Sequence, residues 1–235
     1  MRDVAVVRFS PTEGPGHLAD WLDARRMPWR LLPLDAGAAV PADSREFAGS
    51  ALMGGPMSVN DPLPWIEPVC ALLRDAVAAG VPVLGHCLGG QLLAKAMGAA
   101  VTRADVAEIG WIDVDVEPGE AARAWFGGRT RFTTFQWHYD AFALPPSATR
   151  VLTNGFNGNQ GYVLDDRHLG LQCHVEMTGD LVAAWLASDA AALPAASTPA
   201  LQSAADIARV AAARVAALNA VADDAYARWA RGLRG

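Results

Sequence analysis

The first hundred residues alternate short apolar runs, typical of β-strands, with longer segments of helical composition. Parallel strands need long crossovers, usually helices, so this alternation predicts an α/β fold: a doubly wound, mainly parallel sheet with helices on both faces. In such sheets ligands bind beyond the carboxyl ends of the strands. The expected strands cover residues 4–9, 29–34, 50–53 and 81–84, and the expected helices cover residues 17–26, 65–79 and 88–97.

The pattern changes to short strands separated by Gly, Pro and Asn clusters in the stretch from Trp111 to Gln172. Residues 111–116 alternate apolar and polar side chains, residues 130–137 are β-rich, and residues 154–159 form a turn-prone loop. We expect a short antiparallel extension of the sheet.

The C-terminal region returns to helical patterns. Residues 180–187 predict one short helix, and Thr198 is placed to cap another that begins at Pro199. Small and apolar residues then recur at helical spacing as far as Trp229, which favours packing on the domain, with a subunit contact as the alternative. We expect one main domain over residues 1–190 and a helical extension over 191–235 packed on it.

Composition narrows the class of protein. Hydrophobic residues make up 52% of the 235-residue chain and the net charge is -6, with no basic stripe suited to nucleic acid. The sequence contains no stretch of about 20 apolar residues, so we expect no membrane span. The first residues also lack a signal peptide's apolar core. The three cysteines are expected to be reduced thiols rather than disulfides. We therefore expect a cytoplasmic protein.

A glycine-rich heptapeptide, Gly85-His86-Cys87-Leu88-Gly89-Gly90-Gln91, lies where an expected strand meets an expected helix. Gly-x-Cys-x-Gly is the cysteine form of the nucleophile elbow, a tight turn that holds a reactive side chain over the end of a sheet. A helix that begins after Cys87 also stabilises negative charge on its sulfur. This motif alone is a weak signal, and by itself it is more simply interpreted as a small buried hydrophobe at Cys87.

A cysteine nucleophile needs a base and a group that orients the base. Residues 169–176 read as a strand, in which residues two apart share a face, so His174 and Glu176 are expected side by side and Cys173 is expected in the core. Gly54-Gly55-Pro56 and the N–H of Leu88 are candidates for an oxyanion hole, although the first motif taken by itself is more simply interpreted as an ordinary turn. No second His or Cys pair supplies a closed zinc site, so we expect no metal.

Five motifs occur in an order that resembles class I (triad) glutamine amidotransferases, in particular stand-alone proteins related to the glutaminase domain of GMP synthase. These motifs are Met53-Gly54-Gly55-Pro56-Met57-Ser58-Val59, residues 82–94 around Cys87, Glu108-Ile109-Gly110-Trp111, Trp137-His138-Tyr139-Asp140, and Gly170-Leu171-Gln172-Cys173-His174-Val175-Glu176. The resemblance spans residues 4–176 and implies a flavodoxin-like fold.

The resemblance also implies a role for each matching residue. Cys87 matches the nucleophile, His174 the general base and acid, and Glu176 the carboxylate that orients it. The amides of Gly55 and Leu88 match the oxyanion hole, and Gln91, Trp137 and His138 match substrate-binding positions.

The sequence departs from the family where His86 replaces an aliphatic residue, Cys173 an aromatic one and Val175 the common proline. We interpret His86 mainly as a packing residue, with an effect on the nucleophile as the alternative.

These expectations converge on a cysteine-dependent glutaminase that needs no cofactor and releases glutamate and ammonia. No ATP-binding phosphate loop is visible, so the ammonia would pass to a separate synthase. A γ-glutamyl peptidase or amide hydrolase, and a non-catalytic regulatory partner, are the alternatives. The expected partners are thus glutamine or another γ-glutamyl compound and a synthase, with neither nucleic acid nor membrane, and a homo-oligomer remains open.

Overall fold

A computed structural model describes residues 2–189 and 193–234 of the chain, and this part forms a nine-stranded sheet in the order β2-β1-β3-β4-β9-β8-β7-β5-β6. The first five strands in that order are parallel, and the remaining pairs are antiparallel. The parallel half has the strand order of flavodoxin-like folds, as predicted. The boundary expected between residues 190 and 191 falls in residues 190–192, outside the described residues.

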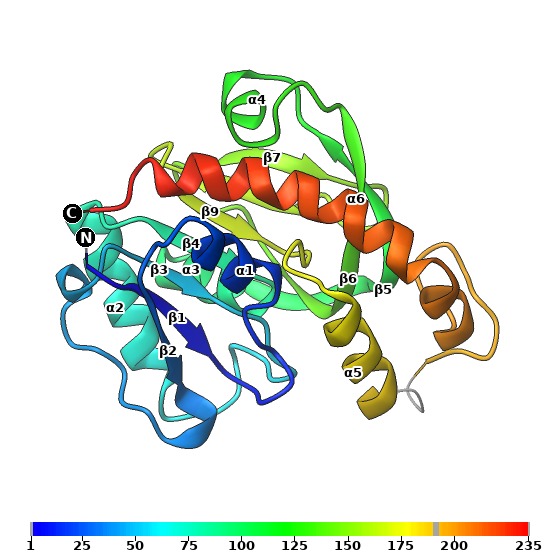
Figure 1. Cartoon of the computed structure of the whole chain (residues 1–235), viewed down its shortest axis with the longest axis horizontal. Coiled ribbons are helices and arrows are strands. Elements are labelled where there is room, and N and C mark those ends of the chain that lie inside the picture. Colours follow the sequence, from blue (N-terminus) through cyan, green and yellow to red (C-terminus); the bar gives the residue numbers. More distant parts are fainter. Residues whose placement is uncertain (1, 190–192, 235) are drawn as a thin grey trace.

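The elements follow the expected alternation closely in the first hundred residues (Figure 1). The strands are β1 (Val4–Arg8), β2 (Trp29–Pro33), β3 (Gly49–Leu52), β4 (Val83–His86), β5 (Val101–Val116), β6 (Arg131–Phe142), β7 (Thr149–Thr153), β8 (Gly161–Leu164) and β9 (His168–Leu171). The α-helices are α1 (His17–Ala24), α2 (Ile66–Ala79), α3 (Leu88–Ala96), α4 (Glu120–Phe126), α5 (Gly179–Asp189) and α6 (Ala204–Ala230), and two 3-10 turns cover Leu34–Ala36 and Ser44–Glu46.

The sheet separates two apolar cores. Along β1, Val4 and Val6 belong to one core while Ala5 and Val7 belong to the other, because successive strand side chains point to opposite faces. Helices α1, α4, α5 and α6 pack on the first face, and α2 and α3 pack on the second. Both faces of the parallel strands are therefore covered, which explains why these strands read as apolar runs.

The antiparallel part of the sheet is larger than the short extension expected. Strands β5 and β6 run together over 16 and 12 residues, with a register shift between Arg103 and Glu108. Residues 101–108 and 138–142 include polar side chains, so the sequence pattern does not predict the outer ends of these strands.

The helix expected from Pro199 begins later, at Ala204. Before that point, Ile109 of β5 donates to Ala200 O and accepts from the N–H of Gln202, which holds the chain extended. Ser203 then caps α6 by accepting a hydrogen bond from the N–H of Asp206 at 3.2 Å. Thr198 instead stabilises a turn with Leu201.

A single helix, α6, follows and runs across the sheet in Figure 1. It buries Leu218, Ala222, Tyr226 and Trp229 in the core, and it contacts α1, α4 and α5. No helix in the described part of the chain is long and apolar enough to cross a membrane.

Candidate active site

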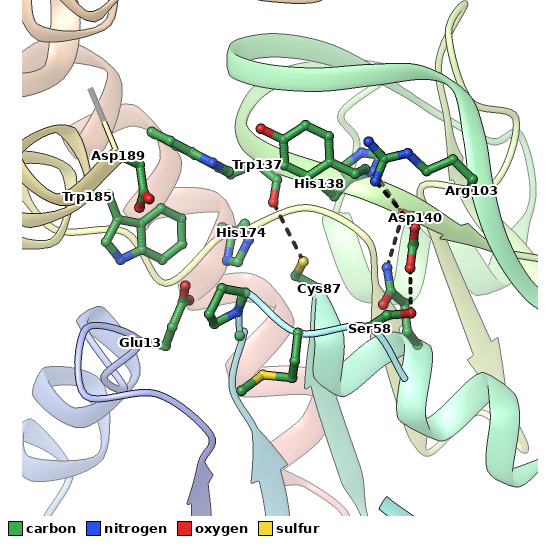
Figure 2. A pocket seen from close by; sticks show the side chains of 15 residues that line it. Glu13, Ser58, Cys87, Arg103, Trp137, His138, Asp140, His174, Trp185 and Asp189 are labelled. Atoms are coloured by element: carbon green, nitrogen blue, oxygen red, sulfur yellow. Dashed lines mark hydrogen bonds and ion pairs between the residues drawn. The ribbon is translucent and has the colours of Figure 1, made fainter. Parts of the chain in front are cut away.

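A pocket of about 250 Å³ opens at the carboxyl edge of the parallel strands. Loops that follow β1, β3, β4 and β9 reach this edge, together with the outer part of β6. Figure 2 shows that Cys87 and His174 lie in the middle of the pocket. This is the place where the rule for doubly wound sheets predicts a site.

Cys87 occupies a sharp turn between β4 and α3 and has φ 47° and ψ -106°, a conformation that is unusual for a residue with a Cβ. Its N–H donates to Leu171 O at 2.9 Å, which ties the turn to β9. A Cβ on Gly89 would lie 2.3 Å from Leu52 O, so only glycine allows α3 to start this close to β3. The expected elbow is therefore present as a strained turn, and Cys87 is 5% exposed.

His174 lies beyond the end of β9, which stops at Leu171 rather than continuing to Glu176 as the sequence suggested. The reason is that the chain leaves the sheet and pairs with β6: the N–H of His174 donates to Phe135 O at 2.9 Å, and Thr134 Oγ1 donates to His174 O. The side chain also packs against Trp185, with ring centroids 4.8 Å apart. Contacts with β6 and Trp185, rather than a continuous strand, thus hold the imidazole in position.

Glu176 lies beside the ring, with His174 Nδ1 2.7 Å from Glu176 Oε1. Burial opposes a charge on His174, but the Glu176 carboxylate and the adjacent Cys87 outweigh it and raise the pKa of His174 well above its usual value. Burial likewise raises the pKa of Glu176, yet His86 and His174 hold it below its usual value. The geometry favours an imidazolium that is fixed by a carboxylate next to sulfur.

His86 is fully buried next to Glu176. Its Nε2 lies 3.7 Å from Glu176 Oε2 and 3.5 Å from the hydroxyl of Tyr226 on α6. Burial lowers the pKa of His86. It therefore faces the carboxylate side of the triad rather than the sulfur.

The two candidate oxyanion donors come from the loop after β3 and from the start of α3. Leu88 is the first residue of α3, and Gly55 lines the pocket in the loop after β3. Among the described residues, the backbone N–H of neither residue donates a hydrogen bond. Both donors are available to a ligand, and their catalytic role stays a prediction.

The three expected substrate-binding residues all line the pocket. Gln91 Nε2 donates to Asp140 O at 3.0 Å and lies 3.3 Å from Gln172 Oε1. Trp137 O is 3.9 Å from Cys87 Sγ. His138 belongs to β6 rather than to a loop, and its ring lies between Asp140 O and the buried Glu108, with Nε2 3.3 Å from Oε2.

The sequence assigned no role to five further lining residues, namely Glu13, Arg103, Asp140, Trp185 and Asp189, of which only Asp140 belongs to a motif named above. Glu13 follows the carboxyl end of β1, so the strand-end rule was the signal for it. The other four come from the outer ends of β5 and β6 and from α5, whose positions depend on tertiary packing.

The other two cysteines lie in the cores. Cys70 is buried on α2, and Cys173 is fully buried as expected, where burial raises its thiol pKa to about 12. Within residues 2–189 and 193–234, no group of three or more His, Cys, Asp or Glu side chains is arranged to hold a metal ion.

Comparison with known proteins identifies relatives of this chain. A solved structure of a glutamine amido transferase from Methylobacillus flagellatus superposes with a TM-score of 0.96 at 45% identity, covering 100% of this chain and 96% of that one. The glutamine amidotransferase-like protein YfeJ of Salmonella typhimurium is 29% identical over 178 residues, which are 72% of this chain and 74% of YfeJ. A subunit of the glutamine-hydrolyzing GMP synthase of Sulfolobus acidocaldarius is 32% identical over 155 residues, 63% of this chain and 79% of that subunit.

The sequence profile of one family, described as glutamine amidotransferase class-I, matches residues 18–187. That span contains the elbow, the His174–Glu176 pair and most of the pocket lining. The chain belongs to the class-I glutamine amidotransferase family.

Proposed function

We propose that this protein hydrolyses the γ-amide of glutamine through a thioester on Cys87. The observation that carries the proposal is the convergence, in one pocket, of a cysteine on a strained elbow and a histidine held by a carboxylate at 2.7 Å. Nucleophile, base and orienting group are the three parts that this chemistry requires. Family membership supports the same reaction class.

In the first half-reaction, the Cys87 sulfur attacks the γ-carbonyl carbon and a C–S bond forms. The carbonyl oxygen becomes an oxyanion that accepts hydrogen bonds from the N–H groups of Leu88 and Gly55. The intermediate then collapses, the C–N bond breaks, and His174 gives its proton to the leaving nitrogen, so that ammonia departs.

In the second half-reaction, His174 takes a proton from water and the resulting hydroxide attacks the thioester carbon. The C–S bond breaks, which releases glutamate and restores the Cys87 sulfur. Glu176 keeps the imidazole oriented through both steps. Gln91, Trp137 and His138 hold the amino-acid end of the substrate.

The test combines substitution with trapping. Cys87→Ala and Cys87→Ser are expected to lower glutaminase turnover by at least about 10⁴-fold. A glutamine-like electrophile is expected to label Cys87 alone, with buried Cys70 and Cys173 as internal controls in the mass map. Undiminished turnover in Cys87→Ala, together with labelling elsewhere, contradicts the proposal.

We infer that the ammonia serves a separate synthase, since one relative is a GMP synthase subunit rather than a complete synthase. A partner of this kind is expected to co-purify with the protein. The test is whether ¹⁵N from the glutamine amide appears in the product of the co-purified synthase. Free ammonia as the sole product in the presence of every native partner contradicts this inference.

A γ-glutamyl amide hydrolase is the second candidate, because the pocket continues past His174 to Trp185 and Asp189. Ammonia as a leaving group does not need that space. Glutamate release from a panel of γ-glutamyl amides distinguishes the two: activity confined to free glutamine contradicts the second candidate.

A further inference from the structure

The pocket has two sides with different charges, and they meet at Cys87 and His174 (Figure 2). On one side lie Arg103 and Asp140, whose charged groups approach within 3.8 Å. On the other lie Glu13, Trp185 and Asp189. Arg103 is the sole Lys or Arg among the described residues that line the pocket.

The Arg103 side fits the amino-acid end of a γ-glutamyl substrate. That end carries one carboxylate and one ammonium group, and Arg103 and Asp140 present one charge of each sign. Asp140 is held in place by the hydroxyl of Ser58, which donates at 2.7 Å, and Gln91 donates to its carbonyl oxygen. This assignment, and the inference that follows, rest on the proposed function.

The leaving group must then lie on the Glu13 side. His174 gives its proton to the leaving nitrogen, so that nitrogen lies next to the imidazole, and the leaving group extends beyond it. Trp185 packs edge-on against this ring and is itself fixed by donating from Nε1 to Thr12 O at 2.8 Å. Trp185 and Trp137 pack at right angles, with centroids 5.9 Å apart, and give this side an aromatic wall.

Glu13 is close to the same imidazole. A Cβ added to Gly54 would lie 2.5 Å from Glu13 Oε2 and 2.8 Å from His174 Cε1, so both groups flank one point. Glu13 Oε2 is buried and has no hydrogen-bond partner among the described residues. A buried carboxyl oxygen without a partner is costly, and a ligand that donates to it removes that cost.

The charges around Glu13 define what that ligand is. Burial raises the pKa of Glu13 to about 7; His174 opposes this shift, and Glu176 and Asp189 add to it. A cation bound beside Glu13 offsets the repulsion from the two other carboxylates. Tryptophan rings next to carboxylates are also a suitable environment for an ammonium group.

We propose that the Glu13 side of the pocket binds a cationic leaving group, so that the protein cleaves γ-glutamyl amides of amines that carry a second positive charge. In this reaction Cys87 forms a C–S bond to the γ-carbonyl carbon, the C–N bond breaks, and His174 protonates the departing nitrogen. The amine leaves with its distal ammonium beside Glu13, and water hydrolyses the thioester to glutamate. Glutamine is then the smallest substrate of the same site.

The test compares two amides that differ only in charge. Mono-γ-glutamyl-1,4-diaminobutane ends in an ammonium group, and γ-glutamyl-n-pentylamide has a methyl group at the same place. We expect wild-type kcat/KM for the cationic amide to exceed that for the neutral amide by about 10-fold or more, the range of a charge-assisted hydrogen bond. Glu13→Gln is expected to bring this ratio to about 1, because the variant lacks the carboxylate that favours the cationic amide. Any general loss of activity cancels in the ratio.

Glu120→Gln is the matched control, since it makes the same chemical change at an exposed position on α4, outside the pocket. Its ratio should equal that of the wild type. A wild-type ratio near 1, or an unchanged ratio in Glu13→Gln, overturns the inference. So does turnover of glutamine with neither amide cleaved.

Binding to Cys87→Ala by calorimetry separates this inference from the proposed function. Tighter binding of the cationic amide, lost in Cys87→Ala/Glu13→Gln, supports the cationic site even where no substrate is turned over. Equal binding of both amides overturns the cationic site while glutaminase activity of the wild type still supports the proposed function.

Discussion

Nε2 of His86 lies 3.7 Å from Oε2 of Glu176, whereas His174 contacts the other carboxylate oxygen, Oε1. Both side chains are almost completely buried. Each oxygen of Glu176 therefore has a histidine nearby, and both histidines lower the pKa of this carboxyl. The hydroxyl of Tyr226 on α6, 3.5 Å from His86, connects the C-terminal helix to this arrangement.

His86→Leu should move the acid limb of the kcat/KM profile to higher pH. His86 helps to hold the pKa of Glu176 below its usual value, so its loss raises that pKa and Glu176 is neutralised earlier on acidification. The pH profile of glutaminase or amide hydrolysis measures this effect. Tyr226→Phe, which keeps the ring, should shift the limb less and in the same direction.

A variant His86→Leu that is less stable but has an unchanged pH profile would show that His86 serves only packing. The melting temperature and the profile must therefore be measured on the same preparation.

Gly54→Ala should reduce kcat by about 100-fold, the effect of a small misplacement of a catalytic group. The added Cβ would lie 2.8 Å from His174 Cε1, so the imidazole must move, while the other close atom belongs to the flexible end of Glu13. Stability should fall by about 1–3 kcal/mol, the usual cost of overpacking a buried site. Steady-state kinetics and thermal unfolding measure the two quantities.

Gly155→Ala is the control for this variant, because no atom lies within 4 Å of its added Cβ. Equal kcat values for the two variants would contradict the placement of His174 against Gly54.

The sequence predicts those parts of the site that follow directly from strand ends. Cys87, Gly55 and Leu88 lie next to β3 and β4, whose apolar runs are easily recognised. The pairing of His174 with Glu176 is also found at 2.7 Å, although the strand that justified it ends at Leu171. The two side chains still lie together, although the chain here forms an isolated β-bridge between His174 and Phe135 instead of a longer strand.

The parts that the sequence does not predict depend on contacts between distant segments. Trp185 reaches the pocket because α5 packs on α6 and the Trp185 ring packs against Phe135 and Trp137 of β6. Arg103 lies on an outer strand end whose polar residues resemble a loop. The start of α6 is delayed to Ala204 by hydrogen bonds to Ile109 on β5, nearly a hundred residues away. Helix propensity alone favours the earlier start.

Trp229→Ala should lower the free energy of unfolding by about 3–5 kcal/mol, the usual cost of removing a large buried aromatic side chain. Trp229 is 1% exposed and belongs to the core that α6 shares with α1. Chemical denaturation measures the change. Phe156→Ala, at a position 37% exposed, should cost much less, and similar costs for both would contradict the packing of α6 on the domain.

Glu13→Gln should make the free energy of unfolding fall less as the pH rises from about 4 to about 8. Burial raises the folded-state pKa of Glu13 from 4.5 to about 7, so the native protein retains this proton more strongly than the unfolded chain does. The resulting stability is present below pH 4.5 and is lost as the pH rises to about 7. The wild type should thus lose up to about 3 kcal/mol more than Glu13→Gln between pH 4 and pH 8.

Denaturation of both proteins at the two pH values measures this difference, and Glu120→Gln should behave as the wild type. A parallel pH dependence in Glu13→Gln and wild type would mean that Glu13 already has a cationic partner or is hydrated, and would remove the chemical reason for a cation at this position.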